Sequence, residues 1–210
     1  MHGSQPRGGE TQRRLLLAAN LVLRGAIIWW LAEAWVFRDD PRFAGKAIPE
    51  RNAAIVGSLS LLIPATWVLR RRRWRDYPAG LDLMYLSIFA LDMAGNSLNF
   101  YNRYRYFDLL PHLHGTGAFS VLVATWWAAR HPGAARRGAG LAEATLLAAG
   151  VATMVHVALE AQEYYTDVLA GTVNVGGVAD TVNDLGVGLI GALVYPPLLI
   201  RWFLPRASTD

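Results

Sequence analysis

Residues 15–37 read LLLAANLVLRGAIIWWLAEAWVF, a run of 23 residues that is apolar apart from three polar side chains. A helix needs about 20 predominantly apolar residues to cross the hydrocarbon core of a bilayer, whereas the apolar core of a signal peptide has only about 7–15. The pair Arg13-Arg14 before the run resembles a twin-arginine export signal, but no small-residue cleavage site follows. We therefore expect this run to be a first transmembrane helix that stays in the protein.

Five further apolar stretches follow, and together they predict an all-α fold, a polytopic membrane bundle of about six transmembrane helices. Of the 210 residues, 53% are hydrophobic and 17% are charged, whereas soluble domains carry about 25% charged residues. Pro64 lies in the second and shortest stretch, where a neighbouring helix can satisfy the carbonyl that a proline leaves free. We expect one transmembrane domain over residues 15–206, a polar and disordered tail over residues 1–14, and a short tail over residues 207–210. The expected spans are Leu15–Phe37, Ala53–Leu69, Leu81–Tyr101, Leu109–Ala129, Leu141–Glu160 and Thr181–Leu204.

Basic residues indicate the orientation of these spans, because cytoplasmic loops carry an excess of Lys and Arg. With the amino terminus inside, the cytoplasmic segments hold about twice as many basic residues as the outer segments. The run Arg70–Arg75 dominates this bias, and an anchor at the anionic inner leaflet explains it better than a nucleic-acid patch. We expect both termini in the cytoplasm, a multi-pass location in a bacterial plasma membrane, membrane lipids as partners and no nucleic acid. The chain has no cysteine, which excludes disulfides and thiolate chemistry.

Polar side chains gather on four of the expected helices, and in each helix they share one face. Positions three or four apart lie on the same side of a helix. An ionisable group near the bilayer centre costs about 2.5–3.5 kcal/mol on insertion scales, so such groups are functional candidates by default. All of these stripes fall in the expected outer half of the membrane, and we expect no comparable cluster in the inner half. The stripes are Asp92, Asn96 and Asn99 in the third span, Asp108 and His112 in the fourth, His156, Glu160, Glu163 and Asp167 in and just after the fifth, and Asp180 and Asp184 at the start of the sixth.

Several polar residues also have structural explanations. Asp108 and Asp180 stand at helix starts, where an aspartate can serve as an N-cap. In the first span, Glu33 could join the site, and Arg24 could either reach the interface or neutralise an acid on a neighbouring helix. The segment 166–179 contains glycines and no basic residue, so we expect a flexible outer loop there.

The number of acidic groups restricts the chemistry, because they cannot all be ionised in a bundle of low dielectric constant. They must share protons, bind cations or face water, unless the deeper ones form a structural hydrogen-bond network. Carboxylates and histidines three or four residues apart on facing helices hold one or two metals in helical bundles. We expect a divalent metal ion as cofactor; two imidazoles favour zinc, manganese or iron, and carboxylates alone favour calcium or magnesium. We assign catalysis to Asp92, His156 and Glu160, substrate binding to Asn96, Asn99 and Tyr104, and metal binding to Asp108, His112, Glu160, Glu163, Asp180 and Asp184.

The same residues carry a resemblance to a known family, through Asp92-x-x-x-Asn96, Asp108-x-x-x-His112, Glu160-x-x-Glu163 and Asp180-Thr181-x-x-Asp184-x-x-x-Gly188. This pattern resembles the YjdF-like family of uncharacterised bacterial inner-membrane proteins, over about the second half of the chain. The last segment is also similar to the tail of the VanZ-like membrane proteins. The resemblance implies a small polytopic protein whose motif residues are the acidic and histidine positions above, and it implies no particular reaction.

The leading interpretation is an outward-facing site that binds a divalent metal and hydrolyses or modifies a lipid-linked or envelope substrate. The chain contains no H-E-x-x-H, P-loop or G-x-S-x-G motif, so nucleophilic catalysis by a serine is disfavoured. One alternative is a proton- or cation-coupled transporter, which at this size would act as a homo-oligomer and would need polar residues on both sides of the midplane. The other is a non-catalytic lipid-binding protein of the envelope.

Overall fold

The computed structural model describes residues 7–131 and 138–203, and every regular element within these ranges is helical. The expected carboxyl-terminal tail lies outside the described residues, as do residues 1–6 of the expected amino-terminal tail. The rest of that tail is helical, because the first helix begins at Arg7. The elements are α1 (Arg7–Val36), α2 (Ile48–Leu59), α3 (Leu62–Leu69), the 3₁₀ turn η1 (Trp74–Asp76), α4 (Ala79–Ser97), α5 (Phe100–Arg103), α6 (Leu109–Arg130), α7 (Gly138–Ala170) and α8 (Val178–Phe203).

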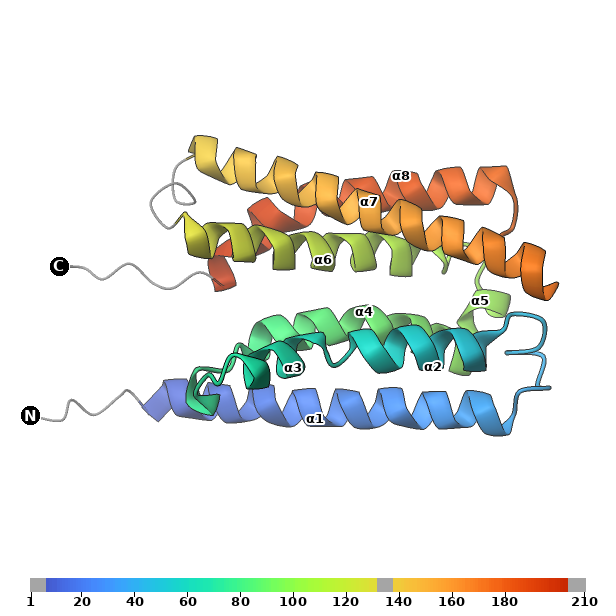
Figure 1. Ribbon diagram of the computed structural model, residues 1–210, viewed down its shortest axis with the longest axis horizontal. Coiled ribbons are helices and arrows are strands. Elements are labelled where there is room, and N and C mark those ends of the chain that lie inside the picture. The colour runs from blue at the N-terminus through green and yellow to red at the C-terminus, as the bar shows by residue number, and fades with distance from the viewer. Residues whose placement is uncertain (1–6, 132–137, 204–210) are drawn as a thin grey trace, which may run out of the picture.

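The long helices run roughly parallel to one another in two layers (Figure 1). One layer contains α1 to α4, in which α1 packs against α4 and α2, and the other contains α6, α7 and α8, which pack against one another. Contacts between α4 and α6 join the two layers. Because α1 begins and α8 ends at the same end of the bundle, the fold suits an even number of spans. Which side of the membrane this end faces stays a prediction.

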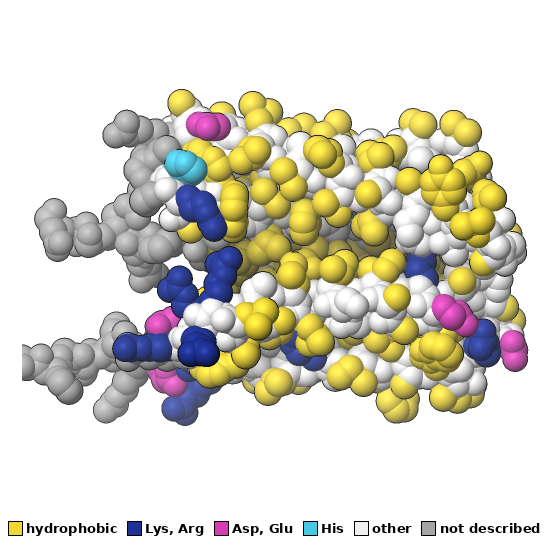
Figure 2. Space-filling view, viewed as in Figure 1, with side chains coloured by type: hydrophobic (Ala, Val, Ile, Leu, Met, Phe, Trp, Pro, Cys, Tyr) yellow, Lys and Arg dark blue, Asp and Glu magenta, His cyan; other side chains and the backbone are white. Residues whose placement is uncertain are grey.

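The surface of the bundle is that of a membrane protein. Figure 2 shows apolar side chains along its length, and most of the visible Lys and Arg gather at the end where α1 begins. Soluble monomers rarely expose contiguous apolar patches of this extent. Within the described residues, four helical segments are long and apolar enough to cross a membrane: Glu10–Val36, Ile48–Leu69, Gly138–Ala170 and Val178–Phe203. The expected helical membrane fold is confirmed at this level, and the count of six spans stays a prediction.

The second expected span is divided into α2 and α3 by a turn at Ser60 and Leu61. Pro64 lies in the first turn of α3, and because proline has no N–H it cannot donate to the carbonyl of Ser60, four residues earlier. Nη1 of Arg24 donates to this carbonyl instead, at 2.8 Å. This confirms the expectation that a neighbouring helix satisfies the carbonyl freed by the proline.

Arg24 also forms a buried ion pair near the end of the bundle where α1 begins. Its Nη2 lies 2.7 Å from Oδ2 of Asp82, in the first turn of α4, and the hydroxyl of Tyr77 donates to the same oxygen at 2.7 Å. Asp82 is only 1% exposed. The expectation that this half of the bundle lacks a buried polar cluster was therefore wrong. Of the two roles considered for Arg24, the structure shows neutralisation of an acid on a neighbouring helix.

Two helix ends differ from the sequence-based boundaries. The third span ends at Ser97 because Asn99 adopts a left-handed conformation with φ of 62°. The fifth span continues to Ala170 as part of α7, so the expected loop over residues 166–179 shrinks to residues 171–177. The carboxylate of Asp167 accepts hydrogen bonds from the backbone N–H groups of Asn174 and Val175, each at 2.8 Å to Oδ2. These bonds fasten the loop to the end of α7.

Small residues allow α8 to lie close to its neighbours. A methyl group added at Gly191 would overlap the backbone carbonyl of Leu113, and one added at Gly188 would overlap the ring of His156. Ala192 lies between these helices with no exposed surface. Close packing of α6 and α8 therefore depends on the absence of side-chain volume along this stripe.

Candidate metal centre

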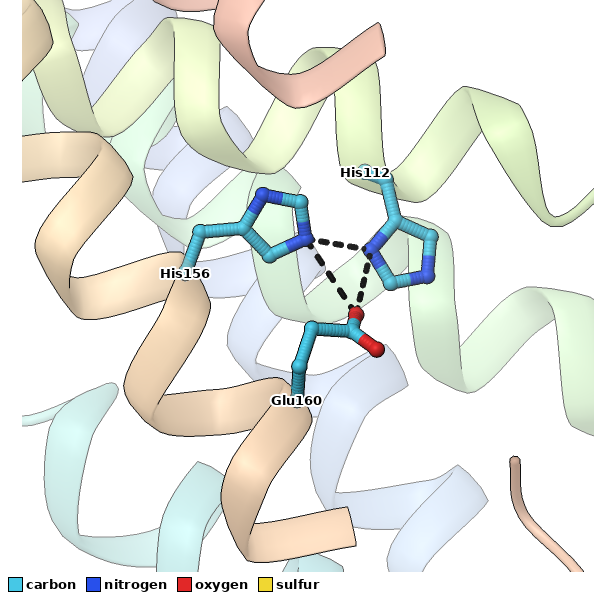
Figure 3. Close-up of side chains that lie close together, drawn as sticks. All are labelled: His112, His156 and Glu160. Atoms are coloured by element: carbon cyan, nitrogen blue, oxygen red, sulfur yellow. Dashed lines mark hydrogen bonds and ion pairs between the residues drawn. The ribbon is translucent and has the colours of Figure 1, made fainter. Parts of the chain in front are cut away.

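Two histidines and one glutamate converge between α6 and α7. His112 projects from the first turn of α6, and His156 and Glu160 lie one turn apart on α7 (Figure 3). Nδ1 of His112 is 2.8 Å from Nε2 of His156. Oε1 of Glu160 lies 3.5 Å from the first nitrogen and 3.4 Å from the second. Three atoms of the kind that binds metals therefore meet at one point inside the protein.

The second nitrogen of each imidazole also has a partner. Nδ1 of His156 faces Oγ1 of Thr116 at 3.1 Å. Nε2 of His112 lies 3.5 Å from Oδ1 of Asp108 and 3.9 Å from Oδ2 of Asp184. Metal-bound histidines ordinarily hydrogen-bond through their second nitrogen, which fixes the tautomer and the ring orientation. The surroundings of both rings match those of metal ligands.

The distances in this centre can be compared with those around an ion. A tetrahedral ion with bonds of about 2.0–2.1 Å holds its ligand atoms about 3.3–3.4 Å apart. The two nitrogen–oxygen distances, 3.4 and 3.5 Å, already fit this geometry. The nitrogen–nitrogen distance of 2.8 Å would have to increase by about 0.5 Å to reach that spacing. The helices therefore already hold the three ligand atoms within about 0.5 Å of the spacing that such an ion requires.

The centre lies on the wall of a cavity of about 440 Å³ between the two layers. Figure 2 shows a hollow between the layers with apolar side chains on its floor. Toward the end where α1 begins, the cavity is apolar and is lined by Leu59, Tyr85, Phe89 and Phe119. Its other part is rich in ionisable groups, with six carboxylates and only three cationic side chains, so additional positive charge or protons must balance it. These groups are Asp92, Asp108, Glu160, Glu163, Asp180 and Asp184, with Lys46, Arg51 and Arg105, beside His112 and His156.

Two of the acids already have partners on the α2 and α4 side. Nη1 of Arg51 lies 2.5 Å from Oε1 of Glu163. The hydroxyl of Tyr101 donates to Oδ1 of Asp92 at 2.8 Å, and Nδ2 of Asn96 donates to the backbone carbonyl of the same aspartate at 3.1 Å. Glu163, expected as a metal ligand, is therefore paired with an arginine, and Asp92 lines the cavity outside the metal centre.

Lys46 is the only lysine of the chain and lies at the cavity, between α1 and α2. Burial lowers the pKa of its ammonium group below the ordinary value of 10.5, against the opposing attraction of Asp108 and Asp92. Within the described part of the chain, neither Lys46 nor Arg105 forms an ion pair. Both cations are available to a ligand of the cavity.

The remaining predicted site residues lie at different places relative to this cavity. Asp180 lines it, and its Oδ2 accepts a hydrogen bond from the backbone N–H of Gly176 at 2.9 Å. Asn99 and Tyr104, assigned to substrate binding, do not line it: Asn99 forms the left-handed turn after α4, and Tyr104 is exposed. Asp108 stands at the N-cap position of α6 but makes no side-chain capping hydrogen bond. Its carboxylate is free to serve the site.

Glu33 does not join the site. Its Oε1 lies 2.8 Å from Nη1 of Arg42, whose guanidinium also contacts Asp40. This ion-pair network fixes the connection between α1 and α2 next to the cavity, and Glu33 is not among the residues that line it.

Sequence reasoning missed several residues that shape the site. The expected second span begins at Ala53 and excludes Arg51, whereas α2 begins at Ile48 and places Arg51 in its first turn, from which it reaches Glu163. Thr116 lies one turn after His112, so the shared helix face would have included it. Nothing in the local sequence indicated that Lys46 would face the cavity, because its position depends on the fold of the connection between α1 and α2.

No curated protein and no solved structure matches this chain. A family of proteins described as "Predicted membrane protein (DUF2238)" matches residues 19–204. The match covers most of α1 and all the later helices, and it supports the expected membrane location and the expected kind of family. The names YjdF-like and VanZ-like stay predictions. The chain belongs to the DUF2238 family of predicted membrane proteins.

Proposed function

We propose that this chain is a six-span protein of the bacterial plasma membrane that binds a divalent metal ion through His112, His156 and Glu160. The observation that carries the proposal is the convergence of three ligand atoms from α6 and α7 within 3.5 Å of one another. With the arginine-rich end in the cytoplasm, this centre lies in the outer half of the membrane.

The lengths of α4 and α6 support six spans. They contain 19 and 22 residues, which corresponds to about 28 and 33 Å of helix. The hydrocarbon core is about 30 Å thick. Neither helix is among the four segments of highest hydropathy. Contacts between α4 and α6 join the two layers, so protein replaces lipid as part of their surroundings.

A metal ion at this place supports hydrolysis of a substrate bound in the cavity. A dication held by His112, His156 and Glu160 would supply an activated water as nucleophile and would polarise a phosphoryl or carbonyl oxygen. Asp92 faces the same cavity without belonging to the centre, so we assign it the role of accepting the proton from that water.

The lining of the cavity supports a lipid-linked substrate. Its apolar part suits acyl or prenyl chains, and the ionisable part places Lys46, Arg51 and Arg105 beside the centre. Cationic side chains together with a divalent ion suit a phosphate-containing headgroup. A lipid with such a headgroup could enter from the bilayer with its chains still in an apolar environment.

Elemental analysis of the detergent-purified protein, supplied with zinc or manganese, tests the metal. We expect at least one tightly held ion per chain, and its loss in the His156→Ala/Glu160→Ala double variant. His114→Ala is the matched control, because His114 lies on α6 but contacts Ser87 and Tyr195 instead of the centre. A wild-type protein without metal, or equal metal in the double variant, contradicts the proposal.

The hydrolytic role has a separate test. Metal-loaded protein is incubated with a bacterial lipid extract, and released phosphate or headgroup is followed by mass spectrometry. Asp92→Asn should abolish release while the ion stays bound. A loaded wild-type protein that releases nothing removes the hydrolytic part of the proposal and leaves the metal site intact.

One observation favours the transporter as a second candidate. The buried pair of Arg24 and Asp82 supplies polar groups in the half of the bundle where the sequence predicted none. However, the two side chains neutralise each other, and neither lines the cavity. Flux of protons or divalent ions into proteoliposomes would support this candidate over the hydrolase.

A further inference from the structure

The imidazole of His112 lies between two groups of acidic and histidine side chains. Its Nδ1 faces His156 and Glu160, and its Nε2 faces Asp108 and Asp184. In each group the candidate ligand atoms all lie within 4.8 Å of one another. One ring therefore offers a nitrogen to each group.

The group on the Nε2 side has no arginine or lysine partner among the residues that the structure describes. Asp184 is 2% exposed, and its Oδ1 is buried without a hydrogen-bond partner. Among the described residues, the ion pairs of Asp108 and Asp184 are with His112 alone, and no arginine or lysine contacts either carboxylate. A buried carboxylate with an unpartnered oxygen is strongly disfavoured unless a cation or a proton compensates it. Both carboxylates also line the cavity, so a cation could reach them.

We infer that Asp108, Asp184 and Nε2 of His112 bind a second divalent cation, and that His112 bridges the two ions as an imidazolate. The inference rests on the proposed function for the first ion, at Nδ1 of His112, His156 and Glu160. Together the two dications balance the excess of carboxylates around the cavity, which a single dication leaves negative.

The protonation balance of this arrangement is simple. A neutral imidazole carries one N–H, and metal ligation at both nitrogens removes this proton, which leaves through the cavity to bulk water. With metal–nitrogen bonds of about 2.0–2.1 Å and ring nitrogens about 2.2 Å apart, the two ions lie about 6 Å from each other. This exceeds the separation of about 3.5–4 Å in two-metal sites that share a substrate or water oxygen. A substrate group that contacts both ions must therefore present two separate oxygens, as a phosphate does.

The competing arrangement uses the same residues with one ion. In that case Nε2–H of His112 donates to Asp108 or Asp184, and these carboxylates orient the ring of a ligand to the first ion. The two arrangements differ in metal stoichiometry, which is directly measurable.

The test is a zinc titration of the full chain in detergent after chelator treatment, with bound metal counted by elemental analysis. We expect two ions per chain in the wild type and one in Asp184→Asn and in Glu160→Gln. Asp92→Asn is the control, since this carboxylate lies at the same cavity outside both groups, and it should keep two. Size-exclusion profiles and unfolding temperatures of all variants show whether each protein is folded.

Two substitutions of the bridging residue sharpen the test. The amide oxygen of His112→Asn lies close to the position of Nδ1, and that of His112→Gln lies close to the position of Nε2. We expect one ion in each. In the His112→Asn variant, adding Glu160→Gln should remove the remaining ion, and adding Asp184→Asn should leave it bound. In the His112→Gln variant, adding Asp184→Asn should remove the remaining ion, and adding Glu160→Gln should leave it bound.

The outcomes separate the two proposals. No bound ion in a folded wild-type protein overturns both. One ion that is lost in Glu160→Gln and kept in Asp184→Asn overturns the second site and leaves the proposed function standing. Two ions that both survive Asp184→Asn and Asp108→Asn place the second site elsewhere and overturn its assignment to these residues.

Discussion

Replacement of Gly188 by alanine should weaken metal binding, although Gly188 is not itself a ligand. The Cβ of an alanine there would overlap Nδ1 of His156 and would lie 2.5 Å from Cε1 of the same ring and 2.9 Å from Oγ1 of Thr116. Ordinary contacts of a Cβ begin at 3.4 Å, so the imidazole must retreat by about 1 Å from α8, a change that close-packed interiors do not absorb freely. Overpacking of this kind destabilises proteins by about 1–3 kcal/mol.

The displacement should also weaken metal binding. A metal–nitrogen bond of about 2.0–2.1 Å does not tolerate a shift of about half its length. The new position also removes the contact with Thr116 that orients the ring. Loss of such an orienting contact alone lowers metal affinity about 10- to 100-fold, so Gly188→Ala should bind zinc at least that much more weakly.

Gly186 provides the matched control, because it lies two residues earlier on α8 and an added methyl group would meet nothing within 4 Å. Gly186→Ala should keep the wild-type zinc affinity and the same or slightly higher unfolding temperature, since alanine favours helix over glycine. Zinc competition against a chromophoric chelator and thermal unfolding followed by tryptophan fluorescence measure the two quantities. Equal zinc affinity and equal unfolding temperature in the two variants would refute the placement of His156 against α8.

Three further predictions concern charged groups around the bundle. Asp82→Ala leaves the charge of Arg24 without its partner and should lower the free energy of unfolding by about 3–5 kcal/mol, with metal content unchanged. If an Arg24→Met/Asp82→Leu double variant is no more stable than Asp82→Ala, the ion pair is not the cause of the loss. Acylation of Lys46 by an amine-specific reagent should reach half its maximal rate below pH 10.5, because burial disfavours the ammonium form and lowers its pKa; a midpoint at or above this pH contradicts the burial of Lys46. Arg51→Gln leaves Glu163 without its cation and should destabilise the protein by about 1–3 kcal/mol. Adding Glu163→Gln to this variant should restore part of the lost stability. If the losses of the two single variants simply add in thermal unfolding of the double variant, the two side chains are not coupled.

The helical fold, and the gathering of most candidate residues at one cavity, could be predicted from the sequence because both depend on short-range periodicity. His156 and Glu160 are four residues apart, as are Asp108 and His112, so one turn of helix places each pair together whatever the rest of the chain does. Long apolar runs likewise predict membrane helices without knowledge of their neighbours.

The remaining features depend on which helix faces meet, and local sequence carries little information on this. Glu163 lies on the same face of α7 as the metal ligands, but it forms an ion pair with Arg51, which is distant in the sequence. Asp82 looks like an ordinary acid in the first turn of a helix until α1 places Arg24 against it. Asn99 belongs to the stripe of Asp92 only if the helix continues, and the left-handed turn at that residue ends it.

The division into two layers has a consequence for biogenesis. Every residue that we assign to the two metal groups lies between Asp108, at the N-cap of α6, and Asp184 on α8, and the first layer contributes no metal ligand. Helices leave the ribosome in chain order and segments fold as they become available, so α1 to α4 emerge before any of the metal ligands. The group of Asp108, His112 and Asp184 is complete only when α8 is in place and supplies Asp184. A chain that stops before α8 is inserted therefore contains His112, His156 and Glu160 but lacks Asp184, and it should be unable to retain both ions.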